Sequence, residues 1–360
     1  MSSRRLPTFL LALLLGAALA GCGSDDDAPS GDDGGGGDRT DAADNGVADS
    51  SPDDSGPDDG GGFPVTIEHA LGSATIEEAP ERVVTWGPSN QDAVLALGVV
   101  PVAMPFLDYG GDDEGVLPWV RENLGDAEVP TLLPNASGEE IPYEAIAEEQ
   151  PDVIVAVYSG LTQEEYDTLS AIAPTVAYPD APWSTSWQDQ TTIIGAALGR
   201  AARADELVAE TEEYLATRSD EFPELAGTTF AYGAEDGAQL ALYTSDDVRV
   251  RLLTDLGMTL APYVDEHAEG DGVYYYVSPE LAGDIEADVF IGWFNDQAAA
   301  DAFAANPAYA QLPAVAAGAF APIAGEDYVT ASSAPTVLSI PWMLDDYLPQ
   351  LAAAATAAGE

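Results

Sequence analysis

Few residues of this chain have side chains that could perform catalysis or hold a bare metal ion. Its 360 residues include one cysteine, Cys22, and two histidines, His69 and His267. Each histidine lies beside a glutamate, whereas a zinc or manganese site needs several imidazole or thiolate ligands. Direct capture of such a metal is therefore not predicted, and we expect both histidines at the surface.

The sequence also lacks the motifs of common hydrolases and phosphotransferases. It contains no G-x-S-x-G elbow, no G-x-x-x-x-G-K-[ST] phosphate loop and no pair of histidines spaced for a metalloprotease. Acidic pairs such as Asp112-Asp113 and Glu164-Glu165 are adjacent, so their side chains point to different sides of a helix or strand. We do not predict an enzyme, although a cleft enzyme and a purely structural surface lipoprotein stay open as alternatives.

Cys22 lies where an export signal ends. Arg4 and Arg5 precede an apolar stretch and two small residues, which is the layout of a signal peptide. The stretch is too short to span a membrane, which takes about 20 apolar residues. Leu19-Ala20-Gly21-Cys22 resembles the lipobox of bacterial and archaeal lipoproteins, so we expect Cys22 to be lipidated. An ordinary cleaved signal is the alternative, and the export route, Sec or twin-arginine, stays open.

The composition changes abruptly after Cys22. Residues 23–62 are almost wholly Asp, Gly, Ser, Ala and Pro, which bury too little apolar area to offset the entropy of ordering a chain. We expect a disordered acidic tether there. From Phe63 the apolar content is that of a globular protein, and about 290 residues suffice for two lobes with separate cores.

The chain is strongly acidic and contains no lysine. It has 64 acidic residues against 10 basic ones, and its formal net charge is −54 at pH 7. Such a charge repels nucleic-acid backbones and anionic lipid headgroups, so nucleic acid and a polybasic membrane patch are excluded as partners. Carboxylates in place of lysine also keep a protein soluble in concentrated salt. We therefore expect a salt-adapted protein.

Short β-rich runs alternate with helical patterns along the globular part, which predicts an α/β fold with two Rossmann-like units. The expected strands are residues 82–87, 99–104 and 152–158 in the first unit, and 228–233, 239–244 and 288–293 in the second.

The longest helical pattern separates the two units. Ser186 can cap its first turn, with Asp189 at the third helical position, and apolar residues then recur at three- and four-residue steps to about Ser219. Such a helix would be a rod of roughly 50 Å. The expected organisation is a signal peptide (1–21), a tether (22–62), an N-terminal α/β lobe (63–185), an interlobe spine helix (186–220), a C-terminal α/β lobe (221–352) and a tail (353–360).

A short pattern occurs once in each unit. Glu144 and Glu280 each open a predicted short helix, and eight residues later an Asp-Val pair opens a buried strand. Taken alone, each glutamate is explained by the positive end of a helix dipole.

In combination these segments resemble the iron-siderophore substrate-binding lipoproteins of ABC importers, within a wider class that also binds vitamin B12 and haem. The resemblance extends over residues 65–351, and its motifs are residues 79–84, 151–154, 158–161, 172–176, 183–187 and 197–199. It implies two lobes joined by one long α-helix with a ligand cleft between them. It also implies an extracytoplasmic, lipid-anchored monomer on the outer face of the cytoplasmic membrane.

In this family, a glutamate on each lobe docks onto arginines of the permease dimer. By motif these glutamates are Glu144 and Glu280, and the internal repeat supports the transfer, because two similar lobes that meet a two-fold symmetric partner present equivalent groups.

Open α/β sheets bind ligands at the carboxyl ends of their strands. Aromatic side chains at predicted strand ends, together with one that precedes the long helix, are therefore candidates for the pocket, where they would contact the organic shell of a metal chelate. For any one of them, a place in the core is the alternative. The candidates are Trp86, Tyr158, Trp183, Tyr243 and Trp293.

Arginine is scarce, and family members often offer a basic group to the ligand from the second lobe. Arg249 and Arg251 lie there, and pairing with nearby carboxylates is the alternative for each. We select Arg249, because a planar guanidinium suits iron-bound hydroxamate or carboxylate oxygens. The expected ligand is an Fe(III)-siderophore complex, of the neutral hydroxamate type rather than triply anionic catecholate, with cobalamin or haem as alternatives. No resident cofactor is expected.

Overall fold

The computed structural model describes residues 62–134, 140–268 and 272–359. The expected signal peptide, Cys22 and all of the tether except Gly62 lie outside the described residues. No helix in the described part of the chain is long and apolar enough to cross a membrane.

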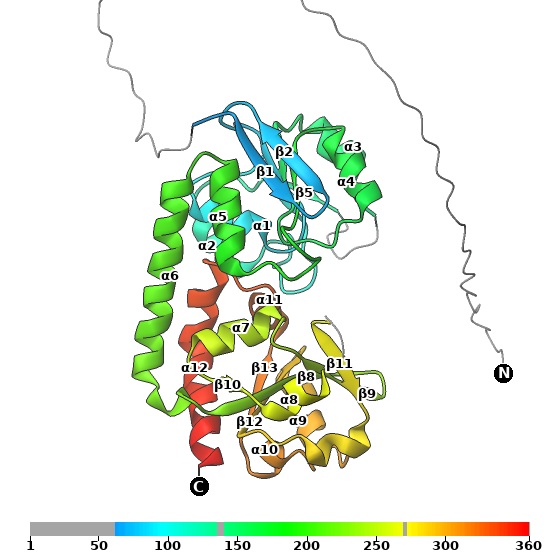
Figure 1. Ribbon diagram of the computed structural model, residues 1–360, viewed down its shortest axis with the longest axis vertical. Helices are drawn as coiled ribbons and strands as arrows, with labels where there is room; N and C mark the ends of the chain where they lie inside the picture. Colours follow the sequence, from blue (N-terminus) through cyan, green and yellow to red (C-terminus); the bar gives the residue numbers. More distant parts are fainter. Residues whose placement is uncertain (1–61, 135–139, 269–271, 360) are drawn as a thin grey trace, which may run out of the picture. The chain divides into compact units, whose positions relative to one another are not determined.

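The N-terminal lobe is built on a parallel five-stranded sheet with strand order β5-β4-β3-β6-β7, and β1 and β2 form a separate antiparallel hairpin (Figure 1). Its elements are β1 (Val65–His69), β2 (Gly72–Ile76), β3 (Val83–Thr85), α1 (Asn90–Ala96), β4 (Ala103–Pro105), α2 (Pro118–Leu124), β5 (Thr131–Leu133), α3 (Tyr143–Glu148), β6 (Val153–Val155), α4 (Gln163–Ser170), β7 (Thr175–Val176) and α5 (Trp187–Ala197).

The central strands of this sheet are aliphatic without alternation because both faces are covered. Successive side chains of a strand point to opposite faces. Accordingly, Val153 and Val155 pack with Val83 in one core cluster, whereas Ile154 packs with Val84 in another. A run of buried aliphatic residues is the pattern expected of such a parallel strand.

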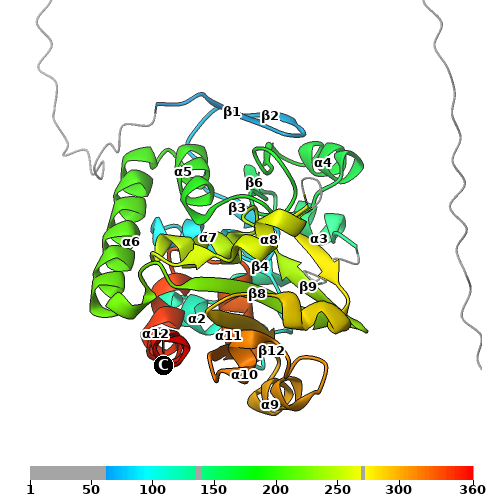
Figure 2. The same ribbon diagram turned by 60° about the horizontal axis from the view of Figure 1, so that its bottom comes forward.

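The C-terminal lobe has a six-stranded mixed sheet with the order β11-β9-β8-β12-β13, and β10 pairs with β8 outside this path. Helices α7 and α8 lie on one side of the sheet, and α9 and α10 lie on the other (Figure 2). Its elements are η1 (Pro223–Leu225), β8 (Thr229–Asp236), β9 (Gln239–Tyr243), α7 (Val248–Asp255), β10 (Thr259–Leu260), α8 (Pro262–His267), β11 (Tyr274–Val277), η2 (Pro279–Asp284), β12 (Val289–Phe294), α9 (Gln297–Ala305), α10 (Pro313–Ala316), β13 (Phe320–Ala324), α11 (Glu326–Ser333) and α12 (Ser339–Ala358).

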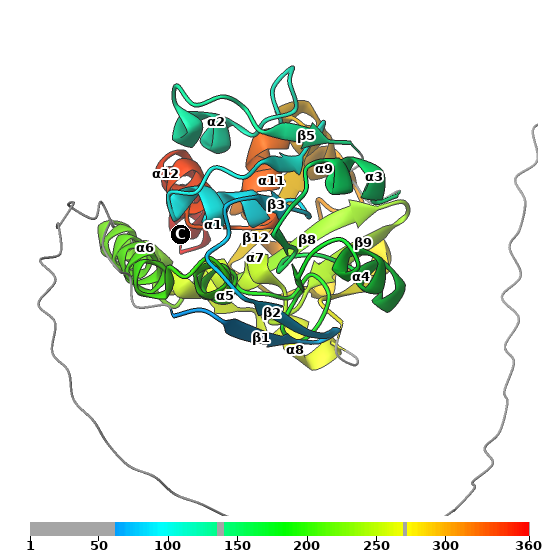
Figure 3. The ribbon, with the colours of Figure 1, turned by 90° about the horizontal axis from the view of Figure 1, so that it is seen from above.

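The prediction of a single spine helix over residues 186–220 is wrong, because this segment forms two helices. Helix α5 ends before Gly199, whose φ of 67° is a left-handed conformation typical of helix ends. Helix α6 (Ala201–Glu221) then runs alone to the C-terminal lobe. Seen from above, α5 lies between α6 and the β1–β2 hairpin (Figure 3). A Cβ on Gly195 would come within 2.3 Å of the Ala204 Cβ, so the two helices pack closely.

The interlobe helix is therefore α6, which is 21 residues long, or roughly 30 Å at 1.5 Å per residue. It is fixed to α12, since the Tyr214 hydroxyl donates to Asp345 at 3.0 Å. The prediction of a tail over residues 353–360 is also wrong in part. Helix α12 continues to Ala358, and Ala354 and Ala355 on its last turns are buried.

Candidate functional site

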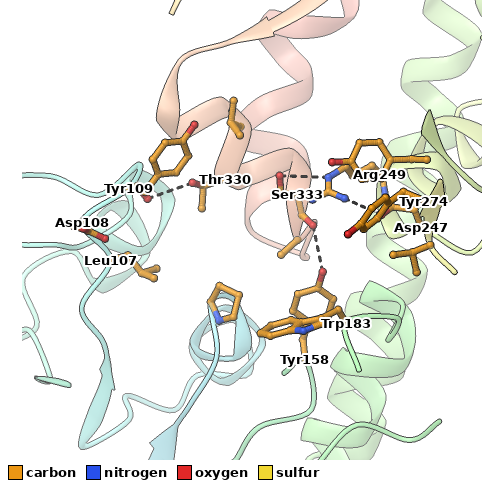
Figure 4. A pocket seen from close by; sticks show the side chains of 15 residues that line it. Leu107, Asp108, Tyr109, Tyr158, Trp183, Asp247, Arg249, Tyr274, Thr330 and Ser333 are labelled. Atoms are coloured by element: carbon orange, nitrogen blue, oxygen red, sulfur yellow. Dashed lines mark hydrogen bonds and ion pairs between the residues drawn. The ribbon is translucent and has the colours of Figure 1, made fainter. Parts of the chain in front are cut away.

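A cleft of about 500 Å³ is lined by residues of both lobes (Figure 4). Loops after β3, β4, β6 and β7 supply one side, and α7, β11 and α11 supply much of the other. A cavity of this size fits a small organic ligand or chelate. Its lining residues are Pro88, Leu107, Asp108, Tyr109, Tyr158, Trp183, Tyr243, Asp247, Arg249, Val273, Tyr274, Val329, Thr330, Ser333 and Ala334.

Aromatic rings from both lobes form much of the cleft wall. The rings of Tyr158 and Trp183 meet edge to face, with centroids 5.7 Å apart, on the N-lobe side. Tyr243 and Tyr274 do the same at 6.0 Å on the C-lobe side. Such rings offer flat apolar surfaces at low conformational cost, so the cleft can accommodate the apolar part of an organic ligand.

Trp183 has an unusual backbone conformation for a large side chain. Its φ is 61°, in the left-handed region that bulky residues avoid, and its amide donates to the Ser159 carbonyl at 3.1 Å. Its indole lies over Gly160, where a Cβ would come within 2.5 Å of the ring. The side chain is nevertheless 46% exposed. The indole therefore lies at the wall of the cleft rather than in the N-lobe core.

Arg249 supplies the one positive charge among the residues that line the cleft. It lies in the first turns of α7, and its Nη1 donates to Asp247 Oδ2 at 2.7 Å. The guanidinium carbon is 4.5 Å from the centre of the Tyr243 ring, a cation–π distance. Nε also faces the Ser333 hydroxyl at 3.4 Å. The guanidinium is therefore held on several sides and keeps a fixed direction toward the cleft.

Burial and neighbouring charges shift the pKa values of Arg249, Asp247 and Tyr158. Burial disfavours the guanidinium charge of Arg249, but the carboxylate of Asp247 and the neighbouring tyrosines outweigh that effect and raise the pKa of the arginine. Burial raises the pKa of Asp247, which Arg249 opposes. Burial also raises the pKa of Tyr158 to about 12. Arg249 thus stays charged and the tyrosine hydroxyl stays neutral at physiological pH.

Contacts between the lobes border the cleft. The Tyr109 hydroxyl donates to Asn295 Oδ1 at 2.7 Å, and the Tyr158 hydroxyl donates to the Ser333 carbonyl at 3.3 Å. Gly110 has a φ of 81°, and a Cβ there would come within 2.6 Å of the Thr330 hydroxyl. The loop after β4 can therefore approach α11 this closely only with glycine at position 110.

A buried carboxylate forms a further contact between the lobes. Asp92 on α1 is fully buried, and its Oδ2 accepts from Trp119 Nε1 at 2.6 Å and from the Thr336 hydroxyl at 2.7 Å. Gln91 Nε2 donates to its Oδ1 at 2.9 Å. Burial raises the pKa of Asp92 to about 7, although these three hydrogen bonds act in the opposite direction. Thr336 lies just before α12, so this carboxylate joins the two lobes.

The structure brings four of the six predicted ligand-binding residues together around one cleft: Tyr158, Trp183, Tyr243 and Arg249. Arg251 is not among the residues that line the cleft. Its Nη2 lies 3.7 Å from Asp246, and its Nη1 donates to the Ser184 carbonyl.

Trp86 and Trp293 do not line the cleft. Trp86 is buried in the N-lobe core and lines a smaller cavity of about 130 Å³ that shares Trp183 with the cleft. Trp293 does not end its strand, because β12 continues to Phe294. Its indole instead donates to the Tyr243 hydroxyl at 3.2 Å, so it contacts a residue that lines the cleft.

Several cleft residues were missed by the sequence reasoning. Leu107, Asp108 and Tyr109 follow strand β4, and the rule that selected Trp86 after β3 applies equally to them. Asp247 could have been predicted from the sequence, because an aspartate two residues before Arg249 is a typical N-cap of the helix that carries this arginine. Thr330 and Ser333 on α11 had no such sequence signal, because their place at the cleft depends on how the lobes pack.

The two repeat glutamates lie in equivalent elements. Glu144 is in the first turn of α3, which leads to β6, and Glu280 is in the first turn of η2, which leads to β12. Both are exposed. Each of these strands lies between two parallel neighbours in its own sheet, β3 and β7 for β6, and β8 and β13 for β12.

The two histidines do not form a metal site. His69 is buried rather than at the surface, contrary to expectation, because it packs edge to face on Tyr166 at 4.9 Å, and burial lowers its pKa. His267 is exposed and stacks on Tyr263. In the described part of the chain, no three His, Cys, Asp or Glu side chains are grouped to hold a metal ion.

Two α/β lobes that share one long helix and enclose an aromatic cleft define a two-lobed ligand-binding protein. The chain belongs to the periplasmic binding protein family, whose model matches residues 83–323. Its fold resembles the crystal structure of PiaA from Streptococcus pneumoniae TIGR4 in complex with ferrichrome. The TM-score is 0.75 and the sequences are 35% identical, over 81% of this chain and 99% of PiaA.

Curated relatives give a consistent result. The ferric enterobactin-binding periplasmic protein FepB of Escherichia coli O6:H1 is 28% identical over 271 residues, which are 70% of this chain and 81% of FepB. The Fe(3+) dicitrate-binding periplasmic protein FecB of Escherichia coli K12 is 27% identical over 205 residues, which are 55% of this chain and 63% of FecB.

Proposed function

We propose that this protein is the extracytoplasmic substrate-binding component of an ABC importer, and that it captures a ferric siderophore, with the hydroxamate type favoured. The observation that carries the proposal is the guanidinium of Arg249, fixed within a cleft that is lined by five aromatic side chains. The ferrichrome bound to PiaA, and the names of the ferric enterobactin-binding FepB and the Fe(3+) dicitrate-binding FecB, support iron chelates as the ligand class.

The cleft residues divide the work of binding. Arg249 lines the cleft, and its Nε and Nη1 contact Ser333 and Asp247, so Nη2 would be the nitrogen that donates to iron-bound oxygens. Tyr158, Trp183 and Tyr243 would pack against the organic shell of the chelate. Trp293 would act indirectly, because its indole fixes the hydroxyl of Tyr243.

The protein would then deliver the chelate to a membrane permease. We propose that Glu144 and Glu280 dock onto the two halves of the permease dimer. Their exposure and their equivalent places before β6 and β12 support this role, since a two-fold symmetric partner needs one such group from each lobe.

The same proposal includes the cellular location. A lipoprotein signal peptide over residues 1–21 and lipidation of Cys22 would hold a monomer at the outer face of the cytoplasmic membrane. The acidic residues 22–62 would form the tether between the lipid and the folded lobes. The lipobox-like segment from Leu19 to Cys22 supports this part of the proposal.

A fluorescence titration tests the ligand class. Trp183 lines the cleft, so a bound iron chelate should quench its emission. Ferrichrome, ferrioxamine B, haem and cobalamin are titrated side by side into the folded part of the chain. We expect saturable quenching by the ferric hydroxamates at micromolar concentration or below. Saturation by haem or cobalamin alone would reject the siderophore in favour of that ligand, and no saturation by any of the four would reject the whole class.

A further inference from the structure

The cleft contains a positive charge that is already neutralised. Asp247 is buried, and both of its carboxylate oxygens are engaged by Arg249: Oδ2 accepts from Nη1 at 2.7 Å, and Oδ1 accepts from the backbone amide at 2.8 Å. The second bond makes Asp247 the N-cap of α7. Because the carboxylate is fixed at both oxygens, it cannot turn away when a ligand enters.

The remaining charges of the cleft are few. Apart from this pair, the lining includes one further charged residue, Asp108, which is exposed. Arg251, the nearest arginine along the chain, lies outside the cleft and faces Asp246 and the Ser184 carbonyl. The lining residues thus carry no net positive charge, although an arginine is present.

This balance decides which ferric complexes fit. A ferric trihydroxamate such as ferrichrome is neutral, and its oxygens can accept from the guanidinium without displacing Asp247. A ferric tricatecholate is triply anionic, and it would have to lose water beside a buried carboxylate with no free cation in compensation. PiaA was crystallised with ferrichrome, whereas FepB is named for ferric enterobactin, so family membership alone does not decide the charge of the ligand.

We propose that Asp247 is a specificity-determining residue: by pairing with Arg249, it confines the cleft to neutral or cationic ferric complexes and excludes anionic ones. This inference rests on the proposed function, since it concerns the ligand of the same cleft. It assigns to the aspartate a role that a structural cap would not have, namely a choice between ligands by charge.

The test is the substitution Asp247→Asn. Asparagine keeps an oxygen that can cap α7 and has nearly the same shape, but it leaves the charge of Arg249 uncompensated. Affinities for ferrichrome, ferrioxamine B and ferric enterobactin are measured by fluorescence titration of the folded protein. We expect the wild-type protein to bind ferrichrome at least 100-fold more tightly than ferric enterobactin. In the variant this ratio should fall by a factor of ten or more.

Two further variants isolate the cause. Asp246→Asn makes the same change in net charge at an exposed neighbour outside the cleft, so its ratio should equal that of the wild-type protein. The double variant Asp247→Asn with Arg249→Gln removes both charges. It should therefore lose the increase in affinity for ferric enterobactin that Asp247→Asn alone produces. If Asp247→Asn does not fold, as judged by circular dichroism, Asp247→Ser replaces it, because serine also caps helices without charge.

The outcomes separate the inference from the proposed function. If wild-type protein binds ferrichrome but the ratio is unchanged in Asp247→Asn, the inference is wrong and the proposed function stands. An equal shift in Asp246→Asn would also overturn it, since the overall charge would then be the cause. Tight binding of ferric enterobactin by wild-type protein would overturn it as well. If wild-type protein binds no ferric complex, the proposed function fails, and the inference fails with it.

Discussion

Asp152 and Asp288 hold equivalent positions in the two lobes. Asp152 Oδ2 accepts from the Glu81 backbone amide at 2.8 Å, just before β3, and Asp288 Oδ2 accepts from the Thr229 amide at 2.8 Å, at the start of β8. Each aspartate thereby ties the beginning of one central strand to its parallel neighbour. The repeat seen in the sequence therefore corresponds to a shared structural unit, although the two segments have little else in common.

The first prediction concerns the glutamates that precede these aspartates. The double variant Glu144→Ala, Glu280→Ala should reduce uptake of the ferric siderophore by at least tenfold, because both docking groups would be missing, while ligand affinity stays unchanged. Uptake of radioactive iron by cells that depend on this protein measures the effect.

The matched control is Glu148→Ala with Glu286→Ala, which removes two exposed glutamates from the same two regions. This control should transport normally. Normal transport by the first double variant, with unchanged affinity, would reject the docking role.

The second prediction compares two tryptophans. Trp183 lines the cleft, whereas Trp293 does not and instead donates a hydrogen bond to Tyr243. Trp183→Ala should weaken ferrichrome binding roughly tenfold or more, since a well-placed aromatic anchor contributes about 1.4 kcal/mol or more. Trp293→Phe should weaken it less. Isothermal titration calorimetry gives both affinities, and equal losses in the two variants would contradict the assignment of the cleft.

The third prediction concerns Asp92, which joins the lobes. Its pKa of about 7 in the folded protein exceeds the ordinary value of 3.8, so between these values the folded state holds a proton that the unfolded chain has released. The contribution of this group to stability is therefore fully present below about pH 4, declines as the pH rises to about 7, and stays low above that.

Urea unfolding at pH 5 and pH 8 tests this sign. The stability of the wild-type protein relative to Asp92→Asn should fall by roughly 2 kcal/mol from pH 5 to pH 8. Asp205→Asn, on the exposed face of α6, should show no such change. A difference between wild type and Asp92→Asn that does not vary with pH would show that Asp92 keeps one protonation state throughout.

The fourth prediction follows from the net charge of −54. Exposed carboxylates repel one another in dilute buffer, and salt shortens the Debye length from about 30 Å at 0.01 M to about 3 Å at 1 M. The thermal unfolding temperature should therefore rise by several degrees between dilute buffer and molar NaCl. A flat or falling curve would contradict salt adaptation.

Sequence reasoning predicted features that depend on local pattern. Residues 152–158 show a run of aliphatic residues typical of a buried strand, and the rule that ligands lie at strand ends then selected Tyr158 and Tyr243 correctly as cleft residues. The rule was wrong at Trp293, because β12 extends one residue beyond it. Strand ends are set by pairing with β13, which the sequence of β12 alone does not specify.

Other features depended on tertiary packing. The apolar periodicity continues from α5 into α6 because both helices bury a face, so it concealed the break at Gly199, which the glycine itself could have indicated. The contribution of Ser333 to the cleft arises only when α11 approaches the N-terminal lobe. The burial of Asp92 between the lobes had no sequence signal for the same reason.

The central claim is that a ferric complex binds in this cleft with its iron-bound oxygens at Arg249. A crystal structure of the protein with ferrichrome, phased with the anomalous signal of the iron, tests it most directly. We expect one iron peak enclosed by Tyr158, Trp183 and Tyr243, with a hydroxamate oxygen within hydrogen-bond distance of the guanidinium. An iron peak outside the cleft, or a chelate in the cleft that makes no contact with Arg249, would contradict the account.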